Sequence, residues 1–254
     1  MKRLALLAAV AVAVLAGPAL AGSLQDVQSA KALRIGTEGT YAPFTYHDGS
    51  GALVGFDVEI GREVAKRLGV EPVFVEGKWD GLIAGLGADR YDAVINQVGI
   101  TEERKARFDF SDPYIVSRAV LIVKKGNADI KGFADLKGKR AAQSLTSNYG
   151  RIAEGAGATL VGTDGFDQSI QLVLTGRADA TINDNLSFLD FRKQKPDAPV
   201  EVVASQDDAA ASGIIVQRNN PDLVAAINKA LAEIKADGTY ERISQKYFGA
   251  DVSR

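Results

Sequence analysis

The sequence predicts an α/β protein built from two similar lobes with a cleft between them. Strand-like and helix-like segments alternate along most of the chain, which is typical of βαβ units and a mostly parallel sheet. The pattern R-x-D-A-x-I-N occurs at residues 90–96 and again at residues 177–183, an offset of 87 residues. The 254 residues, of which 46% are hydrophobic and 24% charged, are sufficient for one or two domains with a substantial core.

The composition argues against several functional classes. The 30 basic and 32 acidic side chains show no basic excess of the kind that nucleic-acid-binding proteins carry. Cysteine is absent, which excludes disulfides, thiolate metal sites and a cysteine nucleophile. The single histidine, His47, disfavours His-rich metal sites and a Ser-His-Asp arrangement. We therefore expect no metal, no cofactor and no nucleic-acid partner.

The first 21 residues have the form of a secretory signal peptide. Lys2 and Arg3 precede an apolar run over residues 4–16, and residues 19–21 (Ala-Leu-Ala) supply a cleavage pattern. A membrane anchor is the alternative, but the run is shorter than the roughly 20 residues that a spanning helix needs. Because no cysteine is present to carry a lipid, we expect a mature protein that is not lipid-anchored and lies in a Gram-negative periplasm.

The segments of the mature chain before residue 100 are expected to alternate between strands and helices. Apolar residues at helical spacing predict one helix that starts near residue 56 and ends at Gly69, and a second over residues 79–87. The predicted strands lie at residues 33–36, 73–75 and 92–98.

The repeat predicts the same design in the second half of the chain. The offset aligns Trp79-Asp80 with Phe166-Asp167, and it brings the following helices into phase. Each copy thus has an aromatic residue and an aspartate at a helix start, an amphipathic helix, a turn and an apolar strand. Chance similarity of short α/β units is the alternative, which five identities in seven residues disfavour.

Two apolar segments are candidates for strands that cross between the lobes, namely residues 119–125 and 213–216. The helical tail over residues 221–248 is expected to return to the first lobe. We therefore assign residues 1–21 to the signal peptide, 22–118 and 214–254 to lobe 1, and 119–213 to lobe 2, with the crossing strands as a hinge. Ligands of open α/β sheets bind beyond the carboxyl ends of strands, so the cleft is the predicted site.

Polar side chains follow both copies of the repeated strand. Asn96 and Gln97 follow the first copy, whereas the second ends in Asn183-Asp184, and these clusters should face each other across the cleft. Thr101 is typical of a helix N-cap, and Arg104 three residues later can pair a carboxylate through two parallel hydrogen bonds. A surface ion pair with a neighbouring glutamate is the alternative for this arginine.

Three further features complete the candidate site. Thr146 and Ser147 can hold the same anion from the other lobe, or they can simply cap a helix. Asp184 requires a cation, either a ligand ammonium or a nearby lysine, or it has a structural role. Tyr41 and Trp79 can enclose an aliphatic or sulfur-containing side chain, although aromatic residues commonly lie in cores. Together these groups describe a zwitterionic amino acid.

Four motifs carry a family resemblance: YAPF at residues 41–44, GFDVE at 55–59, ITEER at 100–104 and FDFSDPY at 108–114. With these motifs the mature chain resembles, over essentially its whole length, the periplasmic amino-acid-binding proteins of ABC importers, solute-binding protein family 3. The resemblance implies the two-lobe periplasmic-binding-protein (type II) fold. It implies that Arg104 clamps the ligand α-carboxylate, that Asp184 takes the α-ammonium, and that Tyr41 and Trp79 line the side-chain pocket.

Within that family the sequence is most similar to cystine- or cysteine-binding members, at residues 36–41, 78–81, 95–98 and 248–252. The family also implies a second-lobe hydroxyl, which maps to Thr146 or Ser147. Gly99 stands where a serine or threonine is usual in that family. Glu38 can meet a basic ligand side chain, as for arginine or lysine, or it can pair with a lysine such as Lys78.

These features predict a binding protein, not an enzyme, which captures an L-amino acid and delivers it to an ABC transporter permease in the inner membrane. L-Cystine or cysteine is the preferred ligand, with arginine, lysine or glutamine as alternatives, and a monomer is expected. A periplasmic dehydratase acting on prephenate-like acids, with Glu38 as general acid, is the alternative from another class. A receptor sensor module is disfavoured. The predicted ligand-binding set is Glu38, Tyr41, Trp79, Asn96, Gln97, Gly99, Arg104, Thr146, Ser147 and Asp184.

Overall fold

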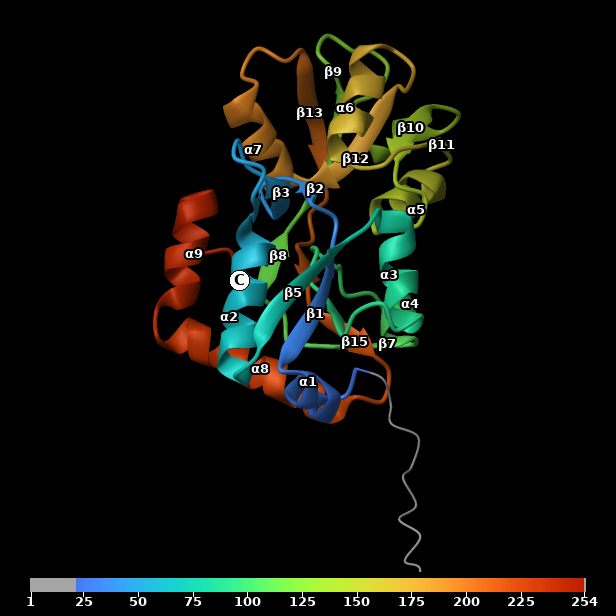
Figure 1. The fold of residues 1–254 in the computed structure, drawn as a ribbon. Coiled ribbons are helices and arrows are strands. Elements are labelled where there is room, and N and C mark those ends of the chain that lie inside the picture. The colour runs from blue at the N-terminus through green and yellow to red at the C-terminus, as the bar shows by residue number, and fades with distance from the viewer. Residues whose placement is uncertain (1–21, 254) are drawn as a thin grey trace, which may run out of the picture.

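The computed structural model describes residues 22–253, which fold into two α/β lobes placed one above the other (Figure 1). The predicted signal peptide lies outside the described residues. Each lobe contains one five-stranded sheet, and a three-stranded sheet of β2 (Thr40–Tyr41), β3 (Thr45–His47) and β4 (Leu53–Val54) lies at the junction of the lobes. The predicted two-lobe α/β fold is therefore confirmed.

The lower lobe is built on a sheet with the strand order β5-β1-β6-β15-β7. These strands are β1 (Ala32–Thr37), β5 (Glu71–Glu76), β6 (Ala93–Val94), β7 (Phe108–Phe110) and β15 (Ile215–Gln217). Its helices are α1 (Leu24–Ala30), α2 (Phe56–Leu68), α3 (Trp79–Gly87), α4 (Glu102–Lys105), α8 (Pro221–Ala236) and α9 (Thr239–Phe248). Gly69 ends α2 in the left-handed conformation at φ 74°, as expected for a glycine C-cap.

The upper lobe is built on a sheet with the strand order β11-β10-β12-β9-β13. These strands are β9 (Ala119–Lys124), β10 (Arg140–Gln143), β11 (Thr159–Gly162), β12 (Ala180–Asp184) and β13 (Val200–Ser205). Its helices are the short 3-10 helix η1 (Phe133–Leu136), α5 (Asn148–Gly155), α6 (Phe166–Leu174) and α7 (Asn185–Gln194).

The expectation of mostly parallel sheets is wrong. In the lower sheet β1 is parallel to β5 and β6, but β15 is antiparallel to β6 and β7. In the upper sheet β10 is parallel to β11 and β12, but β9 is antiparallel to β12 and β13. The reason is that β9 and β15 enter their sheets from the junction of the lobes and run away from it, whereas the βαβ strands run toward it.

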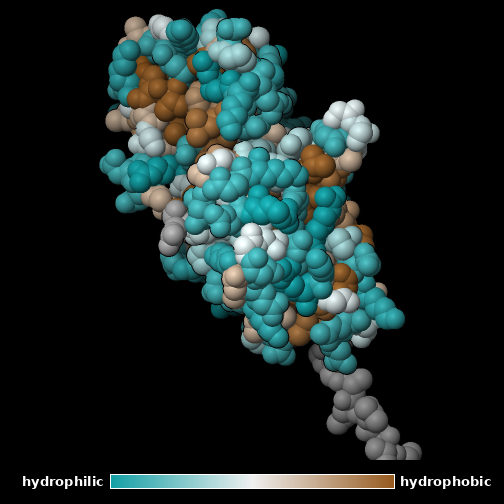
Figure 2. Space-filling view, turned by 90° about the vertical axis from the view of Figure 1, so that its left-hand side faces the viewer, coloured by the Kyte–Doolittle hydropathy of each residue, from teal (hydrophilic) through white to brown (hydrophobic). Residues whose placement is uncertain are grey.

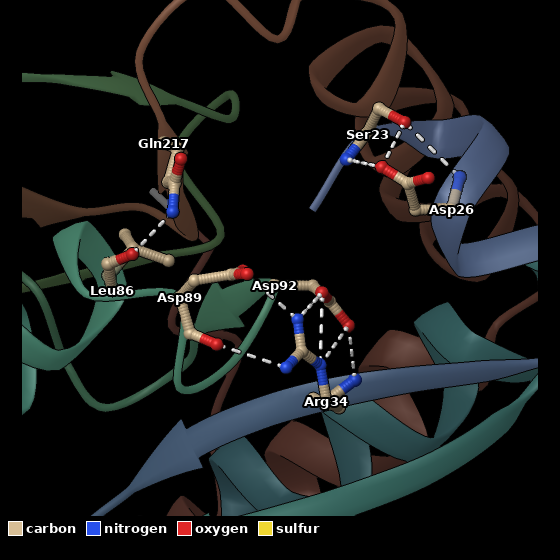
Figure 3. Close-up of polar contacts among 7 residues, drawn as sticks. All are labelled: Ser23, Asp26, Arg34, Leu86, Asp89, Asp92 and Gln217. Atoms are coloured by element: carbon tan, nitrogen blue, oxygen red, sulfur yellow. Dashed lines mark hydrogen bonds and ion pairs between the residues drawn. The ribbon is translucent and has the colours of Figure 1, made fainter. Parts of the chain in front are cut away.

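The internal repeat is confirmed by the structure, because α3 and α6 begin at Trp79 and Phe166, 87 residues apart. The repeated aspartates have the same role in both lobes. Asp92 accepts hydrogen bonds from the main-chain N of Arg34 at 2.8 Å and from its Nη2 at 2.6 Å (Figure 3). Asp179 accepts the equivalent bonds from Arg140, both at 2.8 Å. Each aspartate thus ties its repeated strand to the neighbouring strand of its sheet.

The chain crosses between the lobes through two paired segments. Strand β8 (Ile115–Ser117) precedes β9, β14 (Ala210–Ser212) precedes β15, and β8 and β14 are hydrogen-bonded antiparallel. The predicted lobe boundaries lie next to these strands, and the division itself stays a prediction. The strand expected over residues 92–98 is regular only at β6, and Gln97 has a φ of 51°.

The surface on the α7 and α9 side is mainly hydrophilic, and apolar side chains gather on the upper lobe in that view (Figure 2). Within residues 22–253, no helix has both the length and the apolar character required to cross a bilayer.

Candidate functional site

A cavity of about 40 Å³ lies between the lobes and is lined from both sides. The lower lobe contributes Glu38, Tyr41 and Trp79, and the upper lobe contributes residues that include Ser147 and Tyr149. Four of the predicted site residues therefore meet around one space. An engineered cavity of roughly 150 Å³ holds a molecule as small as benzene. An amino acid therefore requires the lobes or the lining side chains to move apart before it can bind here.

Arg104 lies against Trp79, one of the aromatic residues of the cavity wall. The Thr101 side chain accepts a hydrogen bond from the Arg104 main-chain N at 3.2 Å, so the predicted N-cap is confirmed. The Arg104 side chain is buried, with its Nη1 donating to the Gly99 carbonyl at 2.9 Å and its guanidinium carbon 5.3 Å from the Trp79 ring centre. Cation–π contact of this kind favours the charged guanidinium.

No carboxylate neutralises Arg104 among residues 22–253. Its two glutamate neighbours pair elsewhere, Glu102 with Lys105 and Glu103 with Arg151, so the alternative of a surface ion pair is not found. Burial lowers the pKa of Arg104 to about 10, which still leaves it charged at neutral pH. The lower lobe therefore places a buried positive charge beside the cavity.

Asp184 supplies a buried negative charge from the upper lobe. Its side chain is 1% exposed and accepts a hydrogen bond from the Leu186 main-chain N at 2.8 Å, which caps α7. It also accepts from the Ser117 hydroxyl and from the Tyr149 hydroxyl, the latter at 3.3 Å. Burial raises the pKa of Asp184 to about 6, and no lysine or arginine pairs with it in the part of the chain that the structure describes.

Two tyrosines of the cavity wall donate hydrogen bonds to the end of strand β12, which carries Asp184. Tyr41 donates from its hydroxyl to Asn183 Oδ1 at 2.7 Å, across the lobes. Tyr149, on α5, joins the cavity wall to Asp184. Burial raises the pKa of both phenols well above the ordinary value, so they remain neutral hydrogen-bond donors. Tyr149 was not among the predicted residues; the only signal for it is its place directly after the polar segment 146–148, at the start of a helix.

Glu38 is the acidic group of the cavity wall, and Asn96 holds it. Asn96 Nδ2 donates to Glu38 Oε2 at 2.6 Å, and the Glu38 main-chain N donates to Asn96 Oδ1 at 2.7 Å. Burial raises the pKa of Glu38 to about 7. The alternative partner Lys78 is wrong, because its Nζ pairs with Asp164 at 2.6 Å.

Two of the other predicted residues are engaged within the lower lobe. Gln97 donates from its Nε2 to Asp57 Oδ1 at 3.0 Å and from its main-chain N to Asp57 Oδ2 at 2.8 Å. Gly99 contributes the carbonyl that orients Arg104, and it pairs with Ser212 as an isolated bridge. Of the two polar clusters expected to face each other, Asn183 lines the cavity, whereas Asn96 and Gln97 bond within their own lobe.

The two predicted hydroxyl residues of the upper lobe have different partners. Ser147 caps α5, because its Oγ accepts from the Gly150 main-chain N at 2.9 Å, and it donates to the Ser144 carbonyl at 2.8 Å. The Thr146 hydroxyl donates to Asp80 of the lower lobe at 2.9 Å. Residues 22–253 contain no cluster of three or more His, Cys, Asp or Glu side chains suited to a metal ion.

Comparison with known proteins agrees with this geometry. A family model described as bacterial extracellular solute-binding proteins, family 3, matches residues 33–250. The L-cystine-binding protein TcyA of Bacillus subtilis is 47% identical over 223 residues, which cover 87% of this chain and 83% of the relative.

Two solved structures bear on the arrangement of the lobes. The unliganded, open L-cystine solute receptor of Neisseria gonorrhoeae is 49% identical, with a TM-score of 0.60 and coverage of 91% of this chain and 99% of that chain. An ancestral arginine-binding protein bound to arginine is 42% identical, with a TM-score of 0.81 and coverage of 86% and 99%. The more identical chain is the less similar structure, so the lobes here are arranged more as in the arginine-bound form.

Proposed function

This chain belongs to the bacterial extracellular solute-binding proteins, family 3, and we propose that it captures an L-amino acid between its lobes and delivers it to an ABC transporter permease. Closure around the ligand is then a two-state equilibrium, which the ligand biases by touching both lobes. The mature protein is a periplasmic monomer, exported by the signal peptide that the sequence predicts and not lipid-anchored.

The observation that carries this proposal is a pair of buried, opposite charges on separate lobes. Arg104 is 7% exposed and Asp184 1% exposed, and neither has an ion-pair partner within the described residues. Burying an uncompensated charge is costly, so each position is favoured when a ligand supplies the counter-charge. An α-carboxylate suits the guanidinium and an α-ammonium suits the carboxylate, which together specify a zwitterion.

L-Cystine is the proposed ligand. The relatives named for cystine support it, as do the aromatic walls of Tyr41 and Trp79, which suit the disulfide and methylene groups. Glu38 is the acidic group available to a second cationic end, which is the distal ammonium in cystine and the guanidinium in arginine. Arginine, lysine and glutamine are the alternatives to be tested beside cystine.

Isothermal titration calorimetry with L-cystine, L-arginine, L-lysine and L-glutamine tests the proposal. Arg104→Ala should lower the affinity more than 100-fold, because breaking a buried charge pair costs about 3–5 kcal/mol. Arg107→Ala is the matched control, since Arg107 is exposed and its guanidinium carbon lies 5.6 Å from the Phe108 ring centre, and the substitution keeps the main-chain bond from Arg107 N to the Arg104 carbonyl. Unchanged affinity in Arg104→Ala would refute the clamp, and an equal loss in both variants would point to a general effect of charge.

A dehydratase remains the second candidate, and one observation favours it. Burial raises the pKa of Glu38 to about 7 in the cavity wall, which suits a general acid at neutral pH. The buried carboxylate of Asp184 favours an amine-bearing ligand over an amine-free acid such as prephenate. Incubation of the purified protein with prephenate and arogenate, followed spectroscopically, separates the two, and sustained product formation would overturn the transport proposal.

A further inference from the structure

Asp80, at the start of α3 in the lower lobe, makes hydrogen bonds to the upper lobe that the ligand site does not require. We propose that Asp80 is a positioning residue that latches the two lobes together by gripping residues 145 and 146. This cross-cleft latch (Asp80, Leu145 and Thr146) would slow ligand release without touching the ligand. The inference rests on the proposed function, since it assigns a role in retaining the amino acid.

One carboxylate accepts all the bonds of the latch. Asp80 Oδ1 accepts from the main-chain N and the hydroxyl of Thr146, both at 2.9 Å, and Oδ2 accepts from the main-chain N of Leu145 at 3.3 Å. Main-chain N–H groups bonded to a carboxylate form charge-assisted hydrogen bonds, which are stronger than neutral ones. Figure 1 shows α5, which follows this loop, directly above α3.

The gripped loop carries part of the cavity wall. Ser144 and Ser147 flank the latch residues in the loop, Tyr149 follows on α5, and all three line the cavity. On the lower lobe, Asp80 directly follows Trp79, which is a wall residue itself. The latch therefore holds the walls of both lobes in register, and its loss should loosen the closed arrangement.

Other contacts between the lobes support closure but are weaker candidates. Lys78 Nζ pairs with Asp164 at 2.6 Å, but this is one ion pair between side chains that are 72% and 56% exposed. Asp80 is exposed as well, but it accepts three bonds, two of them from main-chain N–H groups. On the other side of the cavity the Ser187 hydroxyl donates to the Ala42 carbonyl at 2.8 Å, a single neutral bond. Asp80 alone among these residues joins several donors of the opposite lobe.

The internal repeat provides a matched control for Asp80. Asp167 occupies the same place in α6, as an acidic residue of the first turn one position after the aromatic helix start. Asp167 Oδ1 lies 3.9 Å from Nζ of Lys195, in its own lobe. Asp167→Ala therefore removes the same helix-terminus charge as Asp80→Ala but no latch.

The absence of cysteine allows the lobes to be spin-labelled at chosen positions. Lys66 on α2 and Gln171 on α6 are exposed. Spin labels attached at Lys66→Cys and Gln171→Cys report the distance between the lobes by electron–electron double resonance. In ligand-free protein, Asp80→Ala should shift the distances toward longer values, whereas Asp167→Ala should leave them unchanged. Stopped-flow fluorescence of Trp79, the one tryptophan in the chain, should show L-cystine leaving Asp80→Ala about tenfold faster, equivalent to 1.4 kcal/mol.

Thr146→Val provides a milder variant that keeps both main-chain bonds and should show a smaller effect in the same direction. Equal distance distributions and equal dissociation rates in Asp80→Ala and Asp167→Ala would overturn the latch. Failure of every amino acid to bind the parent protein would overturn the proposed function, and the ligand-free distances would still decide the latch.

Discussion

Replacing Asp184 by asparagine should weaken ligand binding and stabilise the ligand-free fold. Asparagine is nearly isosteric, it is as good an N-cap for α7 as aspartate, and it carries no charge to desolvate. The variant therefore separates the charge of this group from its structural role. A variant that binds the ligand less tightly but unfolds less readily would show that the charge of Asp184 serves ligand binding and not the fold.

The magnitude follows from the shift in the pKa of Asp184. Burial raises this pKa from 3.8 to about 6, so the folded protein binds the proton more tightly than the unfolded chain does. The contribution of Asp184 to stability is therefore most favourable below its pKa in the unfolded chain and is lost as the pH rises through its pKa in the folded protein. The difference of about two pH units corresponds to roughly 3 kcal/mol of destabilisation at pH 7, which Asp184→Asn should largely recover.

Urea unfolding of the ligand-free protein at pH 4 and pH 7 measures this effect. The stabilisation by Asp184→Asn should be large at pH 7 and small at pH 4, while calorimetry at pH 7 should show a loss of L-cystine affinity of more than 100-fold. Asp179→Asn is the opposite control. Hydrogen bonds from Arg140 lower the pKa of Asp179, so loss of the Asp179 carboxylate should destabilise the fold. If Asp184→Asn is less stable than the parent at pH 7, the protein itself satisfies this carboxylate and the reasoning fails.

Two further predictions concern the cavity wall and the hinge. Burial raises the pKa of Glu38 from 4.5 to about 7, so the ionisation of Glu38 should lower the stability of the parent protein as the pH rises between these values. Glu38→Gln should remove this loss, which urea unfolding across the pH range measures. Parallel curves of stability against pH for the parent and the variant would contradict the assignment. The Val252 carbonyl accepts at 2.8 Å from the Val116 N–H of strand β8, one of the two segments that cross between the lobes, and Val252 is buried. Deleting residues 250–254 should therefore lower the free energy of unfolding by about 2–3 kcal/mol and the melting temperature by roughly 5–10 °C. An unchanged melting temperature in calorimetry would show that the tail does not stabilise the predicted hinge.

Local sequence signals determined most of the elements. The helix over Trp79–Gly87, the end of α2 at Gly69 and the N-cap at Thr101 follow from hydrophobic spacing, glycine conformation and hydroxyl capping, all of which act within a few residues. The repeat of 87 residues predicted two lobes of one design because each copy presents the same apolar face. The repeat could not predict the direction of β9 and β15, since strand direction depends on how the chain crosses between the lobes.

The partners of the cleft side chains were decided by the tertiary structure. Thr146 looked equally suited to a ligand or a helix cap, but folding brings it to Asp80, 66 positions earlier in the chain. Tyr149 donates to Asp184, and Asn96 donates to Glu38, for which the sequence left a basic ligand side chain or a lysine open. Residue types predict which polar groups need a partner, because burial makes an unpaired group costly. Which partner each receives depends on distances between remote segments, and those exist only once both lobes have packed against each other.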